Sequence, residues 1–174
     1  MIHQSSQSFP QKMIQDLYHK HYNLDGINAT RNCIINRRDT RVWFNSKKLL
    51  AALKENYPQL EWEIVADIHG LKESAKVYAL IKFLMTPSGS NLFHCFFMHR
   101  GGVILTVEGN QHDWSSVLSI LACGIHHIIF QSPKLNHVAE FPGFNVDVGN
   151  FVKAAGFAVK YLTKGEFPKE ELDF

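Results

Sequence analysis

The chain has few cysteines and no long apolar run, and its first residues do not resemble a signal peptide. Its three cysteines, Cys33, Cys95 and Cys123, are odd in number and lie in apolar segments, which is typical of buried free thiols in a reducing compartment. No apolar run approaches the ~20 residues that cross a bilayer. The first nine residues lack the basic and apolar parts of a signal peptide. We therefore expect a cytoplasmic protein without a membrane span.

Strong charge and several familiar catalytic motifs are also missing. A net charge of +2 gives no basis for binding nucleic acid or a membrane surface. The chain has no Walker loop, no Gly-x-Ser-x-Gly elbow and no Gly-x-Gly-x-x-Gly after its first expected strand. Its ten histidines include no pair with a third ligand at a spacing that fixes metal geometry, so we predict no metal site.

The pattern that is present is an alternation of strands and helices. It predicts an α/β fold, in which a Rossmann-like parallel sheet of about five strands carries helices on both faces. We expect residues 1–30 to form an arm or linker, 31–162 the domain and 163–174 a charged tail. The expected strands are 32–36, 61–66, 79–85, 103–107 and 126–130, and the expected helices are 11–22, 47–56, 71–77, 89–98, 114–123 and 148–162.

Two loops follow expected strands and suit an anion. Arg37, Arg38 and Arg41 crowd the loop after the first strand, and Ser88-Gly89-Ser90-Asn91 follows the third. Loops at strand carboxyl ends open on the same edge of a parallel sheet, where α/β proteins bind ligands. Each loop also has a simpler explanation: the arginines form a solvated charged loop, and Ser88 caps a helix. Because both loops lie on one edge of the sheet, anion binding and the simpler explanations are about equally favoured.

Other residues near this edge are of interest. His94 lies one helical turn beyond the serine-glycine loop, and Glu108 ends the fourth expected strand. Carboxylates at strand ends, here Glu108, Asp67 and Asp113, act as bases or ribose ligands in some enzymes and as helix caps in more. Asn45 or Ser46 is expected to cap the helix that follows.

These pieces in this order resemble the C-terminal half of glycosyltransferase family 61, which includes plant and animal glycan-building enzymes and bacterial capsular-polysaccharide transferases. The resemblance covers about residues 30–162. It rests on Ile34–Arg41, on Phe44-Asn45 with Leu49–Leu53, and above all on Thr86–Met98 followed by Gly101-Gly102.

The resemblance implies one Rossmann-like lobe of a type-B glycosyltransferase, the lobe that binds a nucleotide-sugar donor. It implies transfer to a glycan or glycoprotein acceptor, with inversion and without a metal or other cofactor. Arg37 or Arg38 would neutralise the leaving diphosphate. Arg41, Ser88, Gly89, Ser90, Asn91, His94 and Glu108 complete the expected donor site.

The catalytic residue is not assigned, because the second lobe normally supplies the base. We expect that lobe to come from a partner or from a homo-oligomer, or this chain to be a fragment of a longer enzyme. Ser88 stands where the family motif usually has histidine, and His94 where asparagine is frequent. An alternative is therefore a non-catalytic α/β interaction module derived from a glycosyltransferase.

Overall fold

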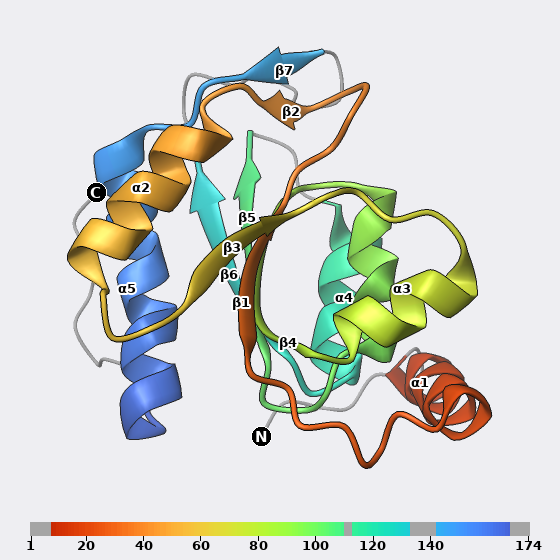
Figure 1. Cartoon of the computed structure of the whole chain (residues 1–174). Helices are drawn as coiled ribbons and strands as arrows, with labels where there is room; N and C mark the ends of the chain where they lie inside the picture. Colours follow the sequence, from red (N-terminus) through yellow and green to blue (C-terminus); the bar gives the residue numbers. More distant parts are fainter. Residues whose placement is uncertain (1–7, 110–112, 133–141, 168–174) are drawn as a thin grey trace.

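The fold is built on a parallel five-stranded sheet, seen in a computed structural model that describes residues 8–109, 113–132 and 142–167. Helices cover both faces of this sheet (Figure 1). The strand order is β3-β1-β4-β5-β6, and every described pairing is parallel. The strands are β1 (Arg31–Ile35), β3 (Trp62–Val65), β4 (Ile81–Pro87), β5 (Val103–Glu108) and β6 (His126–Gln131). The expected Rossmann-like parallel sheet is confirmed.

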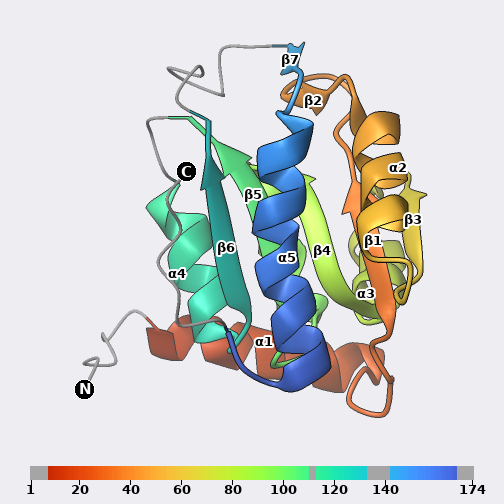
Figure 2. The same ribbon diagram turned by 90° about the vertical axis from the view of Figure 1, so that its left-hand side faces the viewer.

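The helices divide between the two faces. On one face, α2 and α5 pack on a core that includes Ile34, Phe83 and Leu105. On the other, α3, α4 and the 3₁₀ helix η1 pack on the alternate residues, such as Ile35 and Leu84. Figure 2 shows α5 in front of the sheet. The helices are α1 (Ser8–Tyr22), α2 (Ser46–Asn56), α3 (Leu71–Tyr78), η1 (Ser90–Phe97), α4 (Trp114–Ala122) and α5 (Val148–Lys164).

The chain changes direction between β1 and β4. After β1 it runs outward to the edge strand β3, and it then returns to the other side of β1 as β4. Such a reversal leaves a crevice outside the carboxyl ends of the two strands, because their connections leave on opposite faces. The arginine loop follows β1, and the serine-glycine loop follows β4. The topology therefore brings both expected anion loops to the switch point of the sheet.

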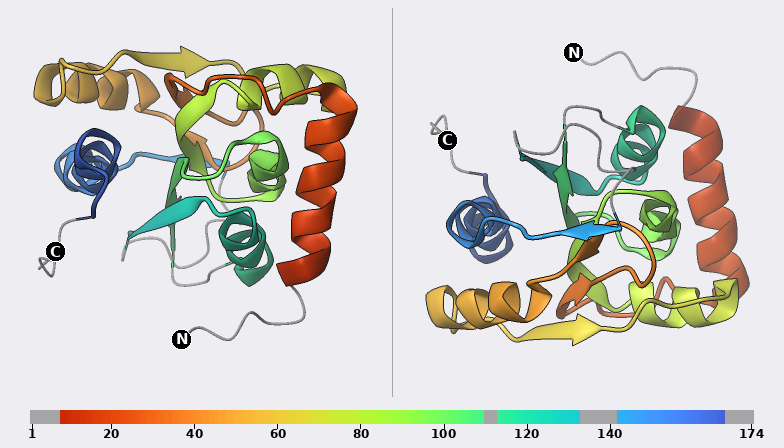
Figure 3. Two further views of the ribbon diagram at one scale, coloured as in Figure 1. Left: turned by 90° about the horizontal axis from the view of Figure 1, so that it is seen from below. Right: turned by 90° about the horizontal axis from the view of Figure 1, so that it is seen from above.

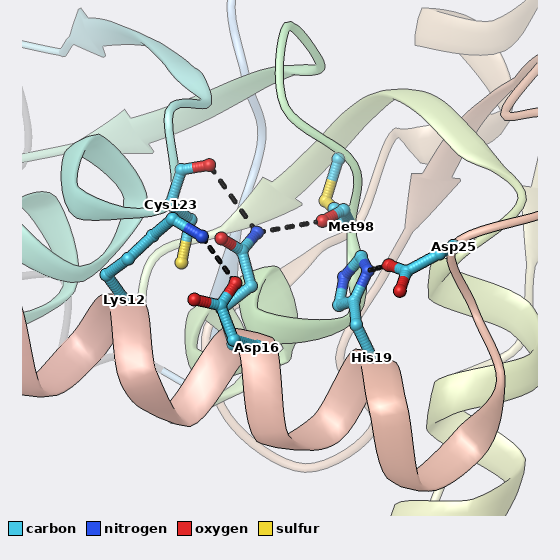
Figure 4. A network of polar contacts seen from close by, with 7 residues as sticks. Lys12, Asp16, His19, Asp25, Met98 and Cys123 are labelled. Carbon is cyan, nitrogen blue, oxygen red and sulfur yellow. Dashed lines mark hydrogen bonds and ion pairs between the residues drawn. The ribbon is translucent and has the colours of Figure 1, made fainter.

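The first helix packs against the domain. α1 crosses the outer side of α3, η1 and α4 (Figure 3). Its buried Gln15 donates from Nε2 to the backbone oxygens of Met98 at 3.1 Å and Cys123 at 3.4 Å. Figure 4 shows the polar contacts at this junction, including His19 Nδ1 to Asp25 Oδ1 at 3.0 Å. Gln15 therefore joins α1 to the carboxyl ends of η1 and α4. The expected domain boundaries stay a prediction.

The segment after β4 differs from the sequence expectation. A helix was expected from Gly89 to Met98, but Ser90–Phe97 forms a 3₁₀ helix. A 3₁₀ helix aligns residues three apart. This repeat stacks the rings of Phe93 and Phe96 at 6.4 Å, and those of His94 and Phe97 at 6.1 Å. Aromatic packing at a spacing of three residues favours the tighter helix here.

A second, two-stranded sheet was not expected from the sequence. β2 (Val42–Trp43) pairs in parallel with β7 (Gly143–Phe144), on the side of the molecule where the strands of the main sheet end (Figure 1). Strands of two residues carry no alternation that a sequence pattern could reveal. This small sheet joins the end of the arginine loop to the start of α5.

Candidate functional site at the switch point

The arginine loop is closed by a side chain at its base. Asn36 Nδ2 donates to the backbone oxygen of Trp43 at 2.9 Å, and Asn36 Oδ1 accepts from the backbone N–H of Trp43 at 2.9 Å. The same oxygen accepts from the backbone N–H of Arg37 at 3.0 Å. The amide thus pairs with Trp43 as a backbone strand would. Residues 37–42 are therefore held as a loop of defined shape.

The two ends of this loop meet at Gly89. A Cβ on Gly89 would lie 2.8 Å from Arg41 Nη1 and still closer to Arg37 Nη1. Gly89 is buried and has a φ of +144°, a conformation that L side chains rarely adopt. The backbone angle therefore favours glycine at this position, and any side chain here would displace the two guanidinium groups. Arg41 itself has a φ of +59°, which is uncommon outside glycine.

Each of the two arginines has a buried nitrogen atom without a hydrogen-bond partner among the described residues. Arg37 Nη1 and Arg41 Nε are buried and have no partner among the described residues. None of the ion pairs seen in this part of the chain includes either side chain. Burial lowers the pKa of Arg41, the positive charge of Arg37 lowers it further, and Asp113 acts in the opposite sense. Two like charges are held together, an arrangement that an anion would stabilise.

The serine-glycine loop, residues 88–91, lies beside the two arginines. Asn91 Nδ2 donates to Thr86 Oγ1 at 2.6 Å, and Asn91 Oδ1 is buried with no partner in the described chain. Ser88 is buried and Ser90 is exposed. The first residue before the 3₁₀ helix is Gly89, and no side chain caps this helix. The capping role considered for Ser88 is therefore wrong.

The structure places Arg38 and His94 in other contacts. Arg38 is exposed, and its Nη2 donates to the backbone oxygen of Asp67 at 3.2 Å. His94 packs between η1 and α3, with its ring 4.7 Å from that of Tyr78 and its Nε2 3.3 Å from Ser74 Oγ. Burial lowers the pKa of His94, and Asp67 opposes the shift. Neither side chain shares the contact at Gly89.

Glu108 lies at the carboxyl end of the neighbouring strand, β5. Its side chain is buried and accepts from Thr106 Oγ1 at 3.2 Å. The same hydroxyl is 2.9 Å from His127 Nε2 on β6. Glu108 therefore belongs to a polar chain across β5 and β6 near the carboxyl edge of the sheet.

Sequence reasoning missed the roles of two asparagines. Asn36 closes the arginine loop, as described above. Asn45 was expected as a helix cap, but its side chain makes no cap bond. Its Nδ2 donates to the Val146 oxygen at 2.7 Å and its Oδ1 accepts from the Val146 N–H at 3.0 Å. Both bonds join segments far apart in sequence, which no local pattern reveals. Asp113, in contrast, does cap α4, through Ser115 and Ser116.

Among the residues that the structure describes, charged side chains also line a hollow away from the switch point. A hollow of about 820 Å³ lies at the other end of the sheet, beside the Arg31–Glu63 ion pair. Those two charges already satisfy each other, whereas Arg37 and Arg41 do not.

Within the described ranges, no three His, Cys, Asp or Glu side chains are grouped to hold a metal ion. No helix of the described chain is long and apolar enough to cross a membrane.

Comparison with known proteins identifies the family. No curated protein matches the chain. The family model Glycosyltransferase 61 matches residues 2–105, which is more than half of the 174 residues. The match includes α1, which lies outside the part of the chain where the sequence motifs showed the resemblance. It ends before Glu108. Both loops that meet at Gly89 lie inside it. The chain therefore belongs to glycosyltransferase family 61.

Proposed function

We propose that the crevice between β1 and β4 binds the diphosphate of a nucleotide-sugar donor. The observation that carries this proposal is the pair of guanidinium groups, Arg37 and Arg41, that meet over Gly89 with buried nitrogens lacking partners. Guanidinium groups bind phosphate oxygens in a forked geometry. The absence of a side chain on Gly89 leaves room for both guanidinium groups beside the backbone at the start of η1.

The same arrangement suits the leaving group of a sugar transfer. Transfer forms a bond between the anomeric carbon and an acceptor hydroxyl oxygen. It breaks the bond to the diphosphate, which leaves with the electron pair. Negative charge on the diphosphate rises during this step, so positive groups already fixed around it lower the barrier. Arg37 and Arg41 would supply this charge, and we propose that transfer inverts the anomeric carbon and needs no metal ion.

A complete reaction also requires a base that takes the proton of the acceptor hydroxyl. We assign no base in this chain, and we propose that a second lobe supplies it together with the glycan or glycoprotein acceptor site. In a type-B arrangement that lobe would face the carboxyl edge of this sheet. Donor binding is therefore the part of the function that can be measured with this chain alone.

The test is calorimetric titration with UDP, GDP and ADP as probes. We expect micromolar to millimolar binding of at least one of them, since a single lobe lacks the contacts of the closed enzyme. Arg37→Ala or Arg41→Ala should each weaken binding about 10- to 100-fold, because each removes a charged hydrogen bond worth about 1.5–3 kcal/mol. EDTA should leave the affinity unchanged.

Two controls separate this site from general charge. Arg100→Ala removes the same charge from an exposed residue beside Gly124, in the connection that leads into β5, and it should leave binding unchanged. Arg38→Ala should weaken binding much less than Arg41→Ala. If none of the three probes binds the wild-type protein, donor binding is refuted and the non-catalytic interaction module is favoured.

A further inference from the structure

Helix α1 contacts the domain through a partly polar face. Among residues 10–22, whose burial the structure describes, only Gln15 and His19 are buried. Tyr18 is half-buried, and its ring lies 5.0 Å from that of Phe97. The aliphatic side chains of this helix are all exposed, namely Met13, Ile14 and Leu17. Docking of α1 therefore depends on its polar contacts more than it would for a helix with an apolar inner face.

His19 meets a second histidine, His99, which lies in the connection between η1 and β5. The two rings are 5.1 Å apart and nearly perpendicular, at 85°. His19 Nδ1 is 3.0 Å from Asp25 Oδ1 (Figure 4). The Nε2 atoms of both histidines are buried and have no hydrogen-bond partner in the part of the chain that the structure describes. Two titratable rings therefore face each other where α1 meets the domain.

The charged groups around the two histidines come from several elements. A hollow of about 350 Å³ beside them is lined by Arg100 and by Lys12 and Asp16 of α1, and these last two pair with each other. Burial lowers the pKa of His99, and the neighbouring histidine lowers it further. Asp25 opposes this shift in pKa, and Lys82 of β4 adds to it. The Asp25 side chain is 80% exposed, so it offsets a positive charge here only weakly.

A proton on either ring would destabilise this contact. A protonated imidazole carries an N–H on both nitrogens, so the buried Nε2 would become a donor without an acceptor. A buried charge without a partner is also far less favourable than a neutral ring. When α1 leaves the domain, both rings reach water and both penalties disappear. Docking of α1 is therefore coupled to the loss of protons.

We infer that α1 is a pH-sensitive arm, which is docked while His19 and His99 are neutral and is released when they gain protons. Leu24, which follows α1, is buried in the core, so the released segment ends before it. A histidine in water titrates near pH 6.5. Because the pKa of His99 is lowered in the docked state, docking is favoured above about pH 6.5 and weakens as the pH falls.

The test is amide hydrogen exchange of the full chain, with each rate divided by the intrinsic rate at the same pH. Protection of residues 10–22 should fall about tenfold between about pH 6.5 and 5.5, since release takes up about one proton, while β4 stays protected. His99→Gln should remove most of this fall, because glutamine does not titrate. His126→Gln is the matched control, since burial also lowers the pKa of His126 but its ring packs against Tyr161 of α5.

Titration of His99 by NMR gives a reciprocal measurement. Gln15→Ala loosens α1 and should raise the pKa of His99 toward its ordinary value near 6.5; an unchanged pKa would overturn the inference. This titration also decides the matter if His99→Gln releases α1 at every pH. Constant protection of α1 down to about pH 5.5, a full wild-type fall in His99→Gln, or a parallel loss of protection in β4 would each overturn the inference as well.

Discussion

The side chain of Asn36 pairs with both backbone groups of Trp43, at 2.9 Å each, and thereby closes the loop that carries Arg37 and Arg41. Trp43 is itself fully buried and packs edge-on against Phe151 of α5. The loop is therefore fixed to the core at its end and to β1 at its start. The two arginines reach Gly89 because of this closure.

Removing the Asn36 amide should loosen the loop. Asn36→Ala leaves the backbone groups of Trp43 and the N–H of Arg37 without partners, which should lower the free energy of unfolding by about 1–3 kcal/mol and weaken nucleotide binding. Urea unfolding and calorimetry measure the two effects. Asn56→Ala is the control, because the exposed Asn56 side chain bonds only Ala52 of its own helix. Unchanged binding in Asn36→Ala would show that the loop needs no clamp.

A methyl group at position 89 should disturb both the fold and the site. Gly89→Ala places a carbon against Arg37 and Arg41 and adds backbone strain on the order of 1–3 kcal/mol. Gly70→Ala, at a φ of +93° with open space around it, carries strain without the clash. We expect both variants to melt at lower temperature, and only Gly89→Ala to lose nucleotide affinity. Equal affinities in the two variants would contradict the placement of the site.

Gln15 should anchor α1. Gln15→Ala leaves the carbonyls of Met98 and Cys123 without this donor, which should cost about 1–3 kcal/mol. The neighbouring Asp16 is exposed and pairs with Lys12 on the surface, so Asp16→Ala should change stability by less than about 1 kcal/mol. Urea unfolding compares the two. If the two variants have equal stability, α1 is not anchored through Gln15.

Stability should fall in mild acid. Burial lowers the pKa values of His94, His99 and His126 in the folded state. An unfolded histidine titrates near pH 6.5, so below that pH the unfolded chain binds protons that the folded chain does not. The stabilisation is present above about pH 6.5 and is lost as the pH falls.

Thermal melts between about pH 7.5 and 5.5 test this dependence. The wild type should melt at progressively lower temperature as the pH falls. His94→Gln, which keeps a polar group beside Ser74, should show a shallower decline. A melting temperature that is constant or rises over this interval would refute the prediction.

Much of the fold follows from local pattern. Each strand of the main sheet was expected within a few residues, because a run such as Ile81–Met85, which is apolar except for Lys82, suits a strand buried on both faces. Two elements differ from the expectation. β4 extends through Thr86 and Pro87, which pair with Thr106 and Val107 although Pro87 reads as a loop residue. Aromatic pairs three residues apart made η1 a 3₁₀ helix.

The candidate site was predictable only in part. The sequence placed Arg41 and Gly89 on two loops at one edge of the sheet, because the carboxyl ends of parallel strands share an edge. The family resemblance favoured Arg37 or Arg38 for the diphosphate, whereas the structure brings Arg41 beside Arg37. Arg38 differs from its neighbours only in the direction that the loop gives its side chain, toward Asp67. The loop that carries Arg38 is itself closed by Asn36 and Trp43, a contact across seven residues.

By itself, the sequence determined the alternation of strands and helices, the parallel sheet and the family motifs, since each depends on neighbouring residues along the chain. The tertiary structure decided the strand order, and with it the switch point between β1 and β4. It also decided which charges meet. Arg37 and Arg41 lie about fifty residues from Gly89 in the chain, and packing of the whole sheet brings them into contact.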